Sequence, residues 1–120
     1  MTESRLVDYL DQLHESASLA CSYIEGLSKA EFLKDKKTQQ AVILNIIVIG
    51  ELATKLSRDH ASFLDKHPSI PWKSMRGMRN RIAHGYFDVD LAIVWDTVHT
   101  GLPELLAALP AIQAGARSLS

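Results

Sequence analysis

The stretch from Ala41 to Ile49 reads AVILNIIVI, and its one polar residue is Asn45. A helix formed here is apolar around nearly its whole circumference, and such a helix must be buried on more than one side. A chain of 120 residues offers few other elements to cover every face of it. We therefore expect part of this helix to pack against a second copy of the chain in a symmetric homodimer. A central helix enclosed entirely within one chain is the alternative.

The composition is that of one folded domain, with 47% hydrophobic and 22% charged residues in a length that suits a single core. Cys21 is the only cysteine and has no partner for an intrachain disulfide. No basic and apolar leader opens the sequence, so we expect a cytoplasmic location. The apolar tract is far shorter than the ~20 residues that cross a bilayer, and we expect no membrane span.

Apolar residues recur at helical spacing along most of the chain. In the first helix they are Leu6, Leu10, Leu13, Ala17, Ala20 and Ile24. The first expected helix runs from Glu3 to Glu25, and a short helix follows the capping box of Ser28 and Glu31. Further helices are expected from Thr38 to about Ser57 and from Asp59 to Lys66. Two more are expected to begin at Pro71 and at Asp88.

The ends of these helices also carry signals. Gly26 is expected to end the first helix in a left-handed conformation, and Thr38 and Asp88 are expected to cap later helices. Pro103 should kink the last helix after Gly101, because proline removes a backbone donor. No strand pattern appears. The sequence predicts an all-α antiparallel bundle of four main helices plus short helices, with one domain over 1–112 and a short frayed tail over 113–120.

Charge is distributed unevenly along the chain. The segment from Lys66 to Phe87 holds five basic residues and no acidic residue, whereas the remainder holds eight basic and fourteen acidic residues. A net charge of +5 on a background of −6 indicates a local surface for an anionic partner such as nucleic acid. Within this surface, Lys73 and Arg76 either form an ordinary solvated face or guide RNA.

The charged segment contains the run from Met78 to Tyr86, MRNRIAHGY. If one continuous helix begins at Trp72, its apolar side comprises Met75, Met78 and Ile82. A polar ridge on another side comprises Arg76, Asn80 and His84. Arg81 then points to solvent. Arg79 and His84 are five positions apart in the sequence, which places them about 140° apart around the axis and about 7.5 Å apart along it. A site that uses both needs the helix to end near His84 or a second copy to supply its own pair.

Two polar residues interrupt the apolar helix. Asn45 either forms a hydrogen bond across the bundle or takes part in catalysis. Glu51 either pairs with an arginine or takes part in catalysis. Gly50 is expected to permit the close approach of another helix. Trp72 and Trp95 are interpreted as core anchors rather than platforms for stacking bases.

Seven short runs carry a resemblance to a known family: Ile49-Gly50-Glu51, Ile70-Pro71-Trp72, Met78-Arg79-Asn80, His84-Gly85-Tyr86-Phe87, Val89-Asp90, Val94-Trp95 and Leu102-Pro103. In these residues the chain resembles the HEPN superfamily and, within it, the HepT toxins that are paired with MntA-type nucleotidyltransferase antitoxins. The resemblance implies a HEPN-type bundle that acts as a metal-independent endoribonuclease toxin, with a composite cleft between the two chains of a homodimer.

By the same resemblance, Arg79 and His84 are the catalytic pair and Asn80 supports them. Tyr86 is implied to receive AMP from the nucleotidyltransferase antitoxin, which silences the toxin in a larger hetero-oligomer. Without the motif, Tyr86 would be interpreted as an ordinary tyrosine at a helix end.

The residue types suit this chemistry. An imidazole can take and give protons near neutral pH, so His84 can assist attack of a ribose 2′-hydroxyl on the adjacent phosphate. The guanidinium of Arg79 matches the oxygens of the charged phosphorane. The histidines and Cys21 show no metal-ligand spacing, and we expect neither a metal nor a cofactor. The alternative function is a non-catalytic HEPN dimer that serves as a binding or regulatory subunit for the nucleotidyltransferase.

Overall fold

The computed structural model describes residues 2–82 and 88–119, and within them every regular element is helical. The three long helices are α1 (Thr2–Tyr23), α3 (Lys36–Asp59) and α8 (Leu102–Arg117). The short elements are α2 (Lys29–Phe32), α4 (Ala61–Asp65), α5 (Trp72–Arg76), α6 (Met78–Ile82), α7 (Leu91–Asp96) and the π-helical turn η1 (Thr97–Gly101). The prediction of an all-α fold is confirmed.

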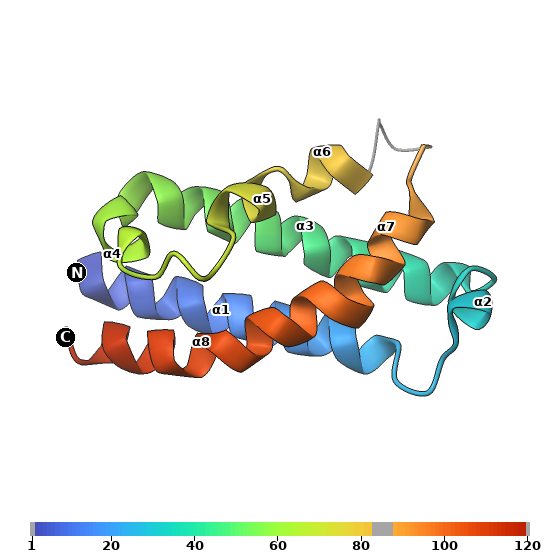
Figure 1. Cartoon of the computed structure of the whole chain (residues 1–120), viewed down its shortest axis with the longest axis horizontal. Helices are drawn as coiled ribbons and strands as arrows, with labels where there is room; N and C mark the ends of the chain where they lie inside the picture. The colour runs from blue at the N-terminus through green and yellow to red at the C-terminus, as the bar shows by residue number, and fades with distance from the viewer. Residues whose placement is uncertain (1, 83–87, 120) are drawn as a thin grey trace.

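The helices alternate in direction along the bundle (Figure 1). The first long helix, α1, packs against both α3 and α8. Helices α5 and α6 run along α3, and α7, η1 and α8 then lead back across the bundle, so that α8 ends beside the start of α1. These four runs correspond to the four main helices predicted from periodicity, two of which are interrupted.

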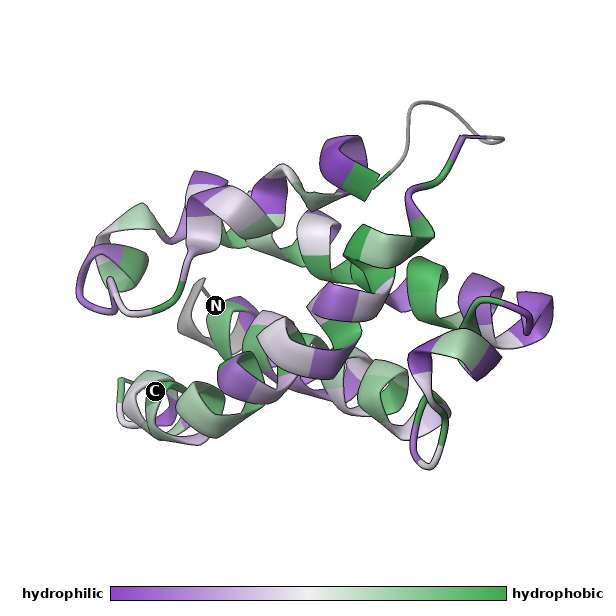
Figure 2. Ribbon diagram, turned by 45° about the vertical axis from the view of Figure 1, so that its right-hand side comes forward, coloured by the Kyte–Doolittle hydropathy of each residue, from purple (hydrophilic) through white to green (hydrophobic). Residues whose placement is uncertain are grey.

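The core follows the predicted apolar stripes. All six apolar positions predicted on the first helix are buried, with exposures between 0% and 8%. On the last run, the residues predicted at helical spacing are also buried, except the half-buried Leu91. At the corner, the ring of Phe32 packs 5.4 Å from that of Trp95, which joins α2 to α7. Figure 2 shows the contrast between these hydrophobic segments and the hydrophilic α6.

Helix α3 is covered on only part of its circumference. Seven of its residues are buried, namely Val42, Ile46, Ile49, Gly50, Leu52, Ala53 and Leu56. On the other side Leu44 is 62% exposed, and Ile43 and Ile47 are half-buried. The alternative of a helix enclosed within one chain is therefore wrong. By length and composition alone α3 could also cross a membrane, a test that core helices of water-soluble proteins pass as well.

The first turns of the chain match their predicted signals. Gly26 has a φ of 78°, the left-handed conformation in which glycine is favoured. Ser28 and Glu31 form the predicted capping box at α2. The start of α3 differs: Asp35, not Thr38, is the cap, because the Asp35 carboxylate accepts hydrogen bonds from both the backbone and the hydroxyl of Thr38. These bonds lower the pKa of Asp35.

Among the residues that the structure describes, Asn45 forms no hydrogen bond across the bundle. Its Nδ2 donates to the carbonyl of Ala41, one turn earlier in α3, at 3.0 Å. A polar side chain on a helix can satisfy itself locally in this way. The described part of the chain therefore does not contain the cross-bundle bond that was one of the two alternatives for Asn45.

The end of the chain is more ordered than predicted. Helix α8 continues past Gln113 to Arg117, and Ala116 is fully buried. Arg117 donates to both carboxylate oxygens of Asp11 at 2.7 Å, and Gln113 donates to the same carboxylate at 2.9 Å. These contacts attach the last turns of α8 to α1, so the prediction that fraying starts at residue 113 is wrong.

A π-helical turn, η1, lies between α7 and α8 and ends at Gly101, the position after which a kink was predicted. The cap of this run is not the predicted Asp88. Instead, Asp90 accepts hydrogen bonds from the backbone N–H groups of Ala92 and Ile93, at 3.1 and 3.2 Å. The helix therefore begins two residues later than expected.

This difference can be tested with two neighbouring aspartates. Asp90→Ala should lower the free energy of unfolding by about 1 kcal/mol, because two backbone donors lose their acceptor, whereas Asp90→Asn should retain most of it. Asp88→Ala is the matched control and should leave the midpoint of urea unfolding nearly unchanged. Equal losses for Asp88→Ala and Asp90→Ala would show that Asp90 is not the cap.

Candidate functional site

Helix α5 is fixed to the core by its first and last turns. Trp72 and Met75 are buried, and the indole Nε1 of Trp72 donates to the carbonyl of His67 at 3.1 Å. A Cβ atom at Gly50 of α3 would lie 3.2 Å from the carbonyl oxygen of Met75. Gly50 thus permits the close approach of α5 to α3, as predicted.

The predicted continuous helix is broken after α5. Gly77 ends α5 with a φ of −87° and a ψ of 0°, and α6 begins at the next residue. The predicted apolar side is confirmed, because Met75 and Ile82 are buried and Met78 is half-buried. The predicted ridge does not lie on one continuous helix, and its last member, His84, lies outside the described residues. Glycine tolerates such a break because it has little preference for continuing a helix.

Helix α6 is anchored at its end. Ile82 is 1% exposed, and its carbonyl accepts a hydrogen bond of 2.7 Å from the backbone N–H of Asp90. Residues 83–87 lie outside the described residues, and they include the predicted catalytic His84 and the predicted modification site Tyr86. The hydrogen bond joins the described chain on the two sides of this segment.

The other predicted site residues lie on the surface of α5 and α6. Arg79 and Asn80 are exposed on α6, and Lys73 and Arg76 are exposed on α5. Arg79 and Asn80 therefore come from the short helix that directly precedes the segment with His84 and Tyr86.

The basic side chains of this region are not neutralised by the described chain. All five, Lys66, Lys73, Arg76, Arg79 and Arg81, are exposed, and none forms a salt bridge with another described residue. The charged groups that do pair lie elsewhere, as Arg58 with Asp59 and Arg117 with Asp11. An exposed, unpaired cluster of this kind favours binding of a polyanion.

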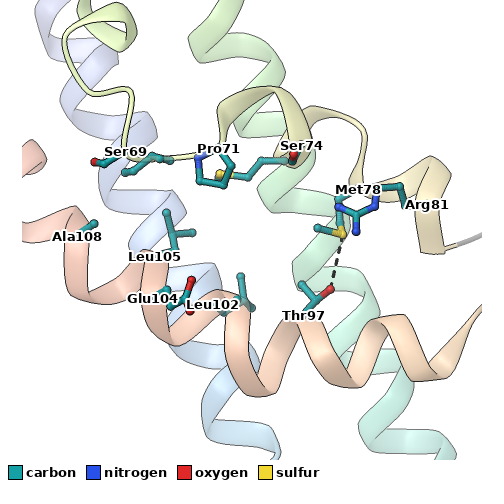
Figure 3. Close-up of a pocket in the computed structure, with 13 residues that line it drawn as sticks. Ser69, Pro71, Ser74, Met78, Arg81, Thr97, Leu102, Glu104, Leu105 and Ala108 are labelled. Carbon is teal, nitrogen blue, oxygen red and sulfur yellow. Dashed lines mark hydrogen bonds between the residues drawn. The ribbon is translucent and has the colours of Figure 1, made fainter.

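A pocket of about 320 Å³ lies between α5–α6 and the η1–α8 run. Figure 3 shows two facing rows of side chains, with Ser69, Pro71, Ser74 and Met78 on one side and Thr97, Leu102, Leu105 and Ala108 on the other. The hydroxyl of Thr97 contacts the sulfur of Met78 at 3.8 Å and bridges the rows. Arg81 is exposed, as predicted, and also lines this pocket. Sequence periodicity missed the pocket because its two walls come from segments that are distant in sequence.

A second groove follows the exposed side of α3. It is lined by Lys36, Gln39, Gln40, Ile43, Leu44, Ile47, Val89 and Leu91. The last two residues belong to the chain that emerges from the 83–87 segment. The exposed apolar side of α3 is thus continuous with the flank of the candidate site.

Two further predictions concern charged and metal-binding groups. Glu51 is exposed, and no arginine pairs with it among the residues that the structure describes. In residues 2–82 and 88–119, no three His, Cys, Asp or Glu side chains gather where they could hold a metal ion.

A family model and individual relatives both match this chain to the HepT ribonucleases. A model described as "Ribonuclease HepT-like" matches residues 13–112. A protein of Thermococcus cleftensis named "Probable ribonuclease HepT" is 39% identical over 98 residues, which cover 82% of this chain and 86% of that protein.

Two further relatives carry the name "Putative RNase". One, from Methanocaldococcus jannaschii, is 38% identical over 95 residues, or 79% of this chain and 76% of that protein. The other, from Caldanaerobacter subterraneus subsp. tengcongensis, is 32% identical over 97 residues, which cover 81% of this chain and 84% of that protein. No solved structure matches the chain significantly.

The contact at Gly50 generates a stability prediction. Gly50→Val should lower the free energy of unfolding by about 1–3 kcal/mol, because the new side chain meets the backbone of α5 at Met75. Gly115→Val is the matched control, since a Cβ there meets nothing within 4 Å, and it should have little effect. Thermal unfolding followed by circular dichroism measures both. An equal effect of the two substitutions would show that α5 does not pack closely on Gly50.

Proposed function

Because the chain belongs to the HepT-like ribonuclease family, we propose that it is an endoribonuclease with a site built around Arg79 and His84. The observation that carries this proposal is the family match over residues 13–112, which includes the whole run from Met78 to Tyr86. The basic residues of α5 and α6 support it, because they are exposed, form no salt bridge within the described part of the chain, and RNA is a polyanion.

The proposed reaction is attack of a ribose 2′-hydroxyl on the neighbouring phosphate. His84 accepts the proton of the 2′-hydroxyl or returns one to the leaving 5′-oxygen, and the exposed guanidinium of Arg79 stabilises the charge on the phosphorane. Asn80, exposed beside Arg79, supports the phosphate, and Lys73 and Arg76 guide the RNA backbone. The products are a 2′,3′-cyclic phosphate and a 5′-hydroxyl, and the reaction needs no metal.

His84→Ala tests this chemistry. Loss of the proton-transfer group should reduce the rate of RNA cleavage by about 100- to 10,000-fold. Cleavage of a labelled RNA in EDTA measures the rate, and His14→Ala, on α1, is the matched control. Wild-type activity that strictly requires Mg²⁺ would contradict the mechanism. Absence of cleavage by both proteins, with binding to a nucleotidyltransferase retained, would favour the non-catalytic binding subunit.

We propose that the active form is a homodimer joined through the exposed side of α3. Leu44, Ile43 and Ile47 leave apolar surface uncovered, and a second copy of the same helix offers a matching surface. The groove along this side reaches Val89 and Leu91, next to the 83–87 segment. A partner seated there would lie beside the motif of the first chain, which favours a composite cleft.

Leu44→Arg tests the dimer. Leu44 is 62% exposed, so the substitution should leave the fold of one chain intact but place a charge in the interface. Sedimentation should show a shift from dimer to monomer, and RNA cleavage should fall with it. Leu119→Arg is the matched control, because Leu119 is also exposed, at 53%. A wild-type protein that sediments as a monomer while cleaving RNA would contradict the proposal.

We further propose that the protein is the toxin of a toxin–antitoxin pair in the cytoplasm. An MntA-like nucleotidyltransferase would transfer AMP from ATP to the hydroxyl of Tyr86 and release pyrophosphate. Tyr86 lies two residues from His84 in the sequence. An added phosphate at this position would compete with RNA phosphate for Arg79, so one modification would block binding and cleavage together.

The Tyr86 proposal predicts a discrete change in intact mass. Incubation with the cognate nucleotidyltransferase and ATP should add one AMP per chain and abolish RNA cleavage. Tyr86→Phe should gain no mass and should keep cutting after the same treatment, whereas the control Tyr23→Phe, exposed at the end of α1, should be modified and silenced like the wild type. Addition of AMP to Tyr86→Phe would place the modification elsewhere.

A further inference from the structure

We propose that the pocket between α5–α6 and η1–α8 holds one unpaired base of the RNA, and that it prefers guanine. This inference rests on the proposed ribonuclease function, because it assigns a specificity pocket to the same site. It is carried by the position of the pocket, by its apolar walls and by the two charged side chains that line it.

The pocket directly adjoins the proposed catalytic helix. Met78 and Arg81, which line it, belong to α6, the same five-residue helix that carries Arg79 and Asn80. RNA whose phosphate lies on Arg79 is therefore held against the helix that forms part of one wall of the pocket. The opposite wall is contributed by η1 and α8, which the proposed chemistry does not otherwise use.

The size and walls of the pocket suit a flat base. Its volume of about 320 Å³ lies at the low end of the range for small-molecule sites. Its apolar walls are Ile70, Met75, Met78, Leu102, Leu105 and Ala108. Sequence-specific recognition of RNA commonly uses bases that are splayed out of the strand and held against such surfaces. Two methionine side chains are well suited, because thioethers contact aromatic rings favourably and adapt in shape.

The charged groups of the pocket can read the edge of the base. Glu104 and Arg81 both line it, and neither forms a salt bridge with another described residue. A carboxylate only accepts hydrogen bonds. Guanine presents two adjacent donors, N1–H and the N2 amino group, whereas adenine and cytosine present one amino group and uracil one imino group. Glu104 therefore favours guanine, and Arg81 is left for the phosphate of the same nucleotide.

Binding can be measured separately from cleavage. The chain has three methionines, and two of them, Met75 and Met78, line the pocket. In protein labelled with ¹³C at the methionine methyl groups, titration with guanosine 5′-monophosphate should shift these two signals and leave that of Met1 in place. Uridine 5′-monophosphate should shift them much less at the same concentration. Signals that do not move, or that move equally with all four mononucleotides, would overturn the proposal.

Cleavage provides the second readout. Short single-stranded RNAs that differ only in the base beside the cut should be cleaved about 10- to 100-fold faster with guanine than with uracil. Glu104→Gln should reduce this preference by about 10-fold. Glu15→Gln, an exposed glutamate on α1, is the matched control and should keep the wild-type preference.

The two readouts separate the two proposals. A wild-type protein that shifts its methionine signals with guanosine 5′-monophosphate but cuts no RNA would contradict the ribonuclease function and leave the pocket supported. A protein that cuts all the RNAs alike, with or without Glu104→Gln, would contradict the pocket and leave the ribonuclease function supported. Methionine signals that respond only to the nucleotidyltransferase would show a protein-docking groove and would overturn the base pocket.

Discussion

The fold depends on the need to cover α3. Its sequence gives it apolar side chains on nearly every side, and burial of one Leu or Ile side chain contributes about 1.5–3 kcal/mol. Helices α1 and α5 meet this need on one side, and the close contact at Gly50 brings the backbone of α5 against the helix. The side that carries Leu44 remains uncovered in one chain. The same requirement that builds the bundle therefore also leads to the proposed second copy.

Much of this architecture could be predicted because helical periodicity reports burial directly. The stripe from Leu6 to Ile24 and the glycine at position 26 behave as their spacing and chemistry indicate. Periodicity could not predict which of two similar nearby residues caps a helix. Asp88 and Asp90 are both good caps, and the backbone hydrogen bond between Asp90 and Ile82 fixes which of them begins the helix.

The candidate site was predictable in its residue types but not in its geometry. Arg79 and Asn80 were placed by motif, and the structure confirms only that they share one short exposed helix. The pocket beside them requires contact between α6 and η1–α8, which are distant in sequence, and no local pattern reports such a contact.

The break at Gly77 also separates residues that are constrained by packing on α3 from residues that are free to contact a ligand. In one continuous helix, a residue needed for packing on α3 would fix the angle of every residue that touches a ligand. Here Trp72 and Met75 hold α5 to the core, and α6 begins afresh after Gly77. Substitutions that retune the surface of α6 need not disturb the anchoring of α5, so relatives can diverge in what they recognise while conserving how they fold.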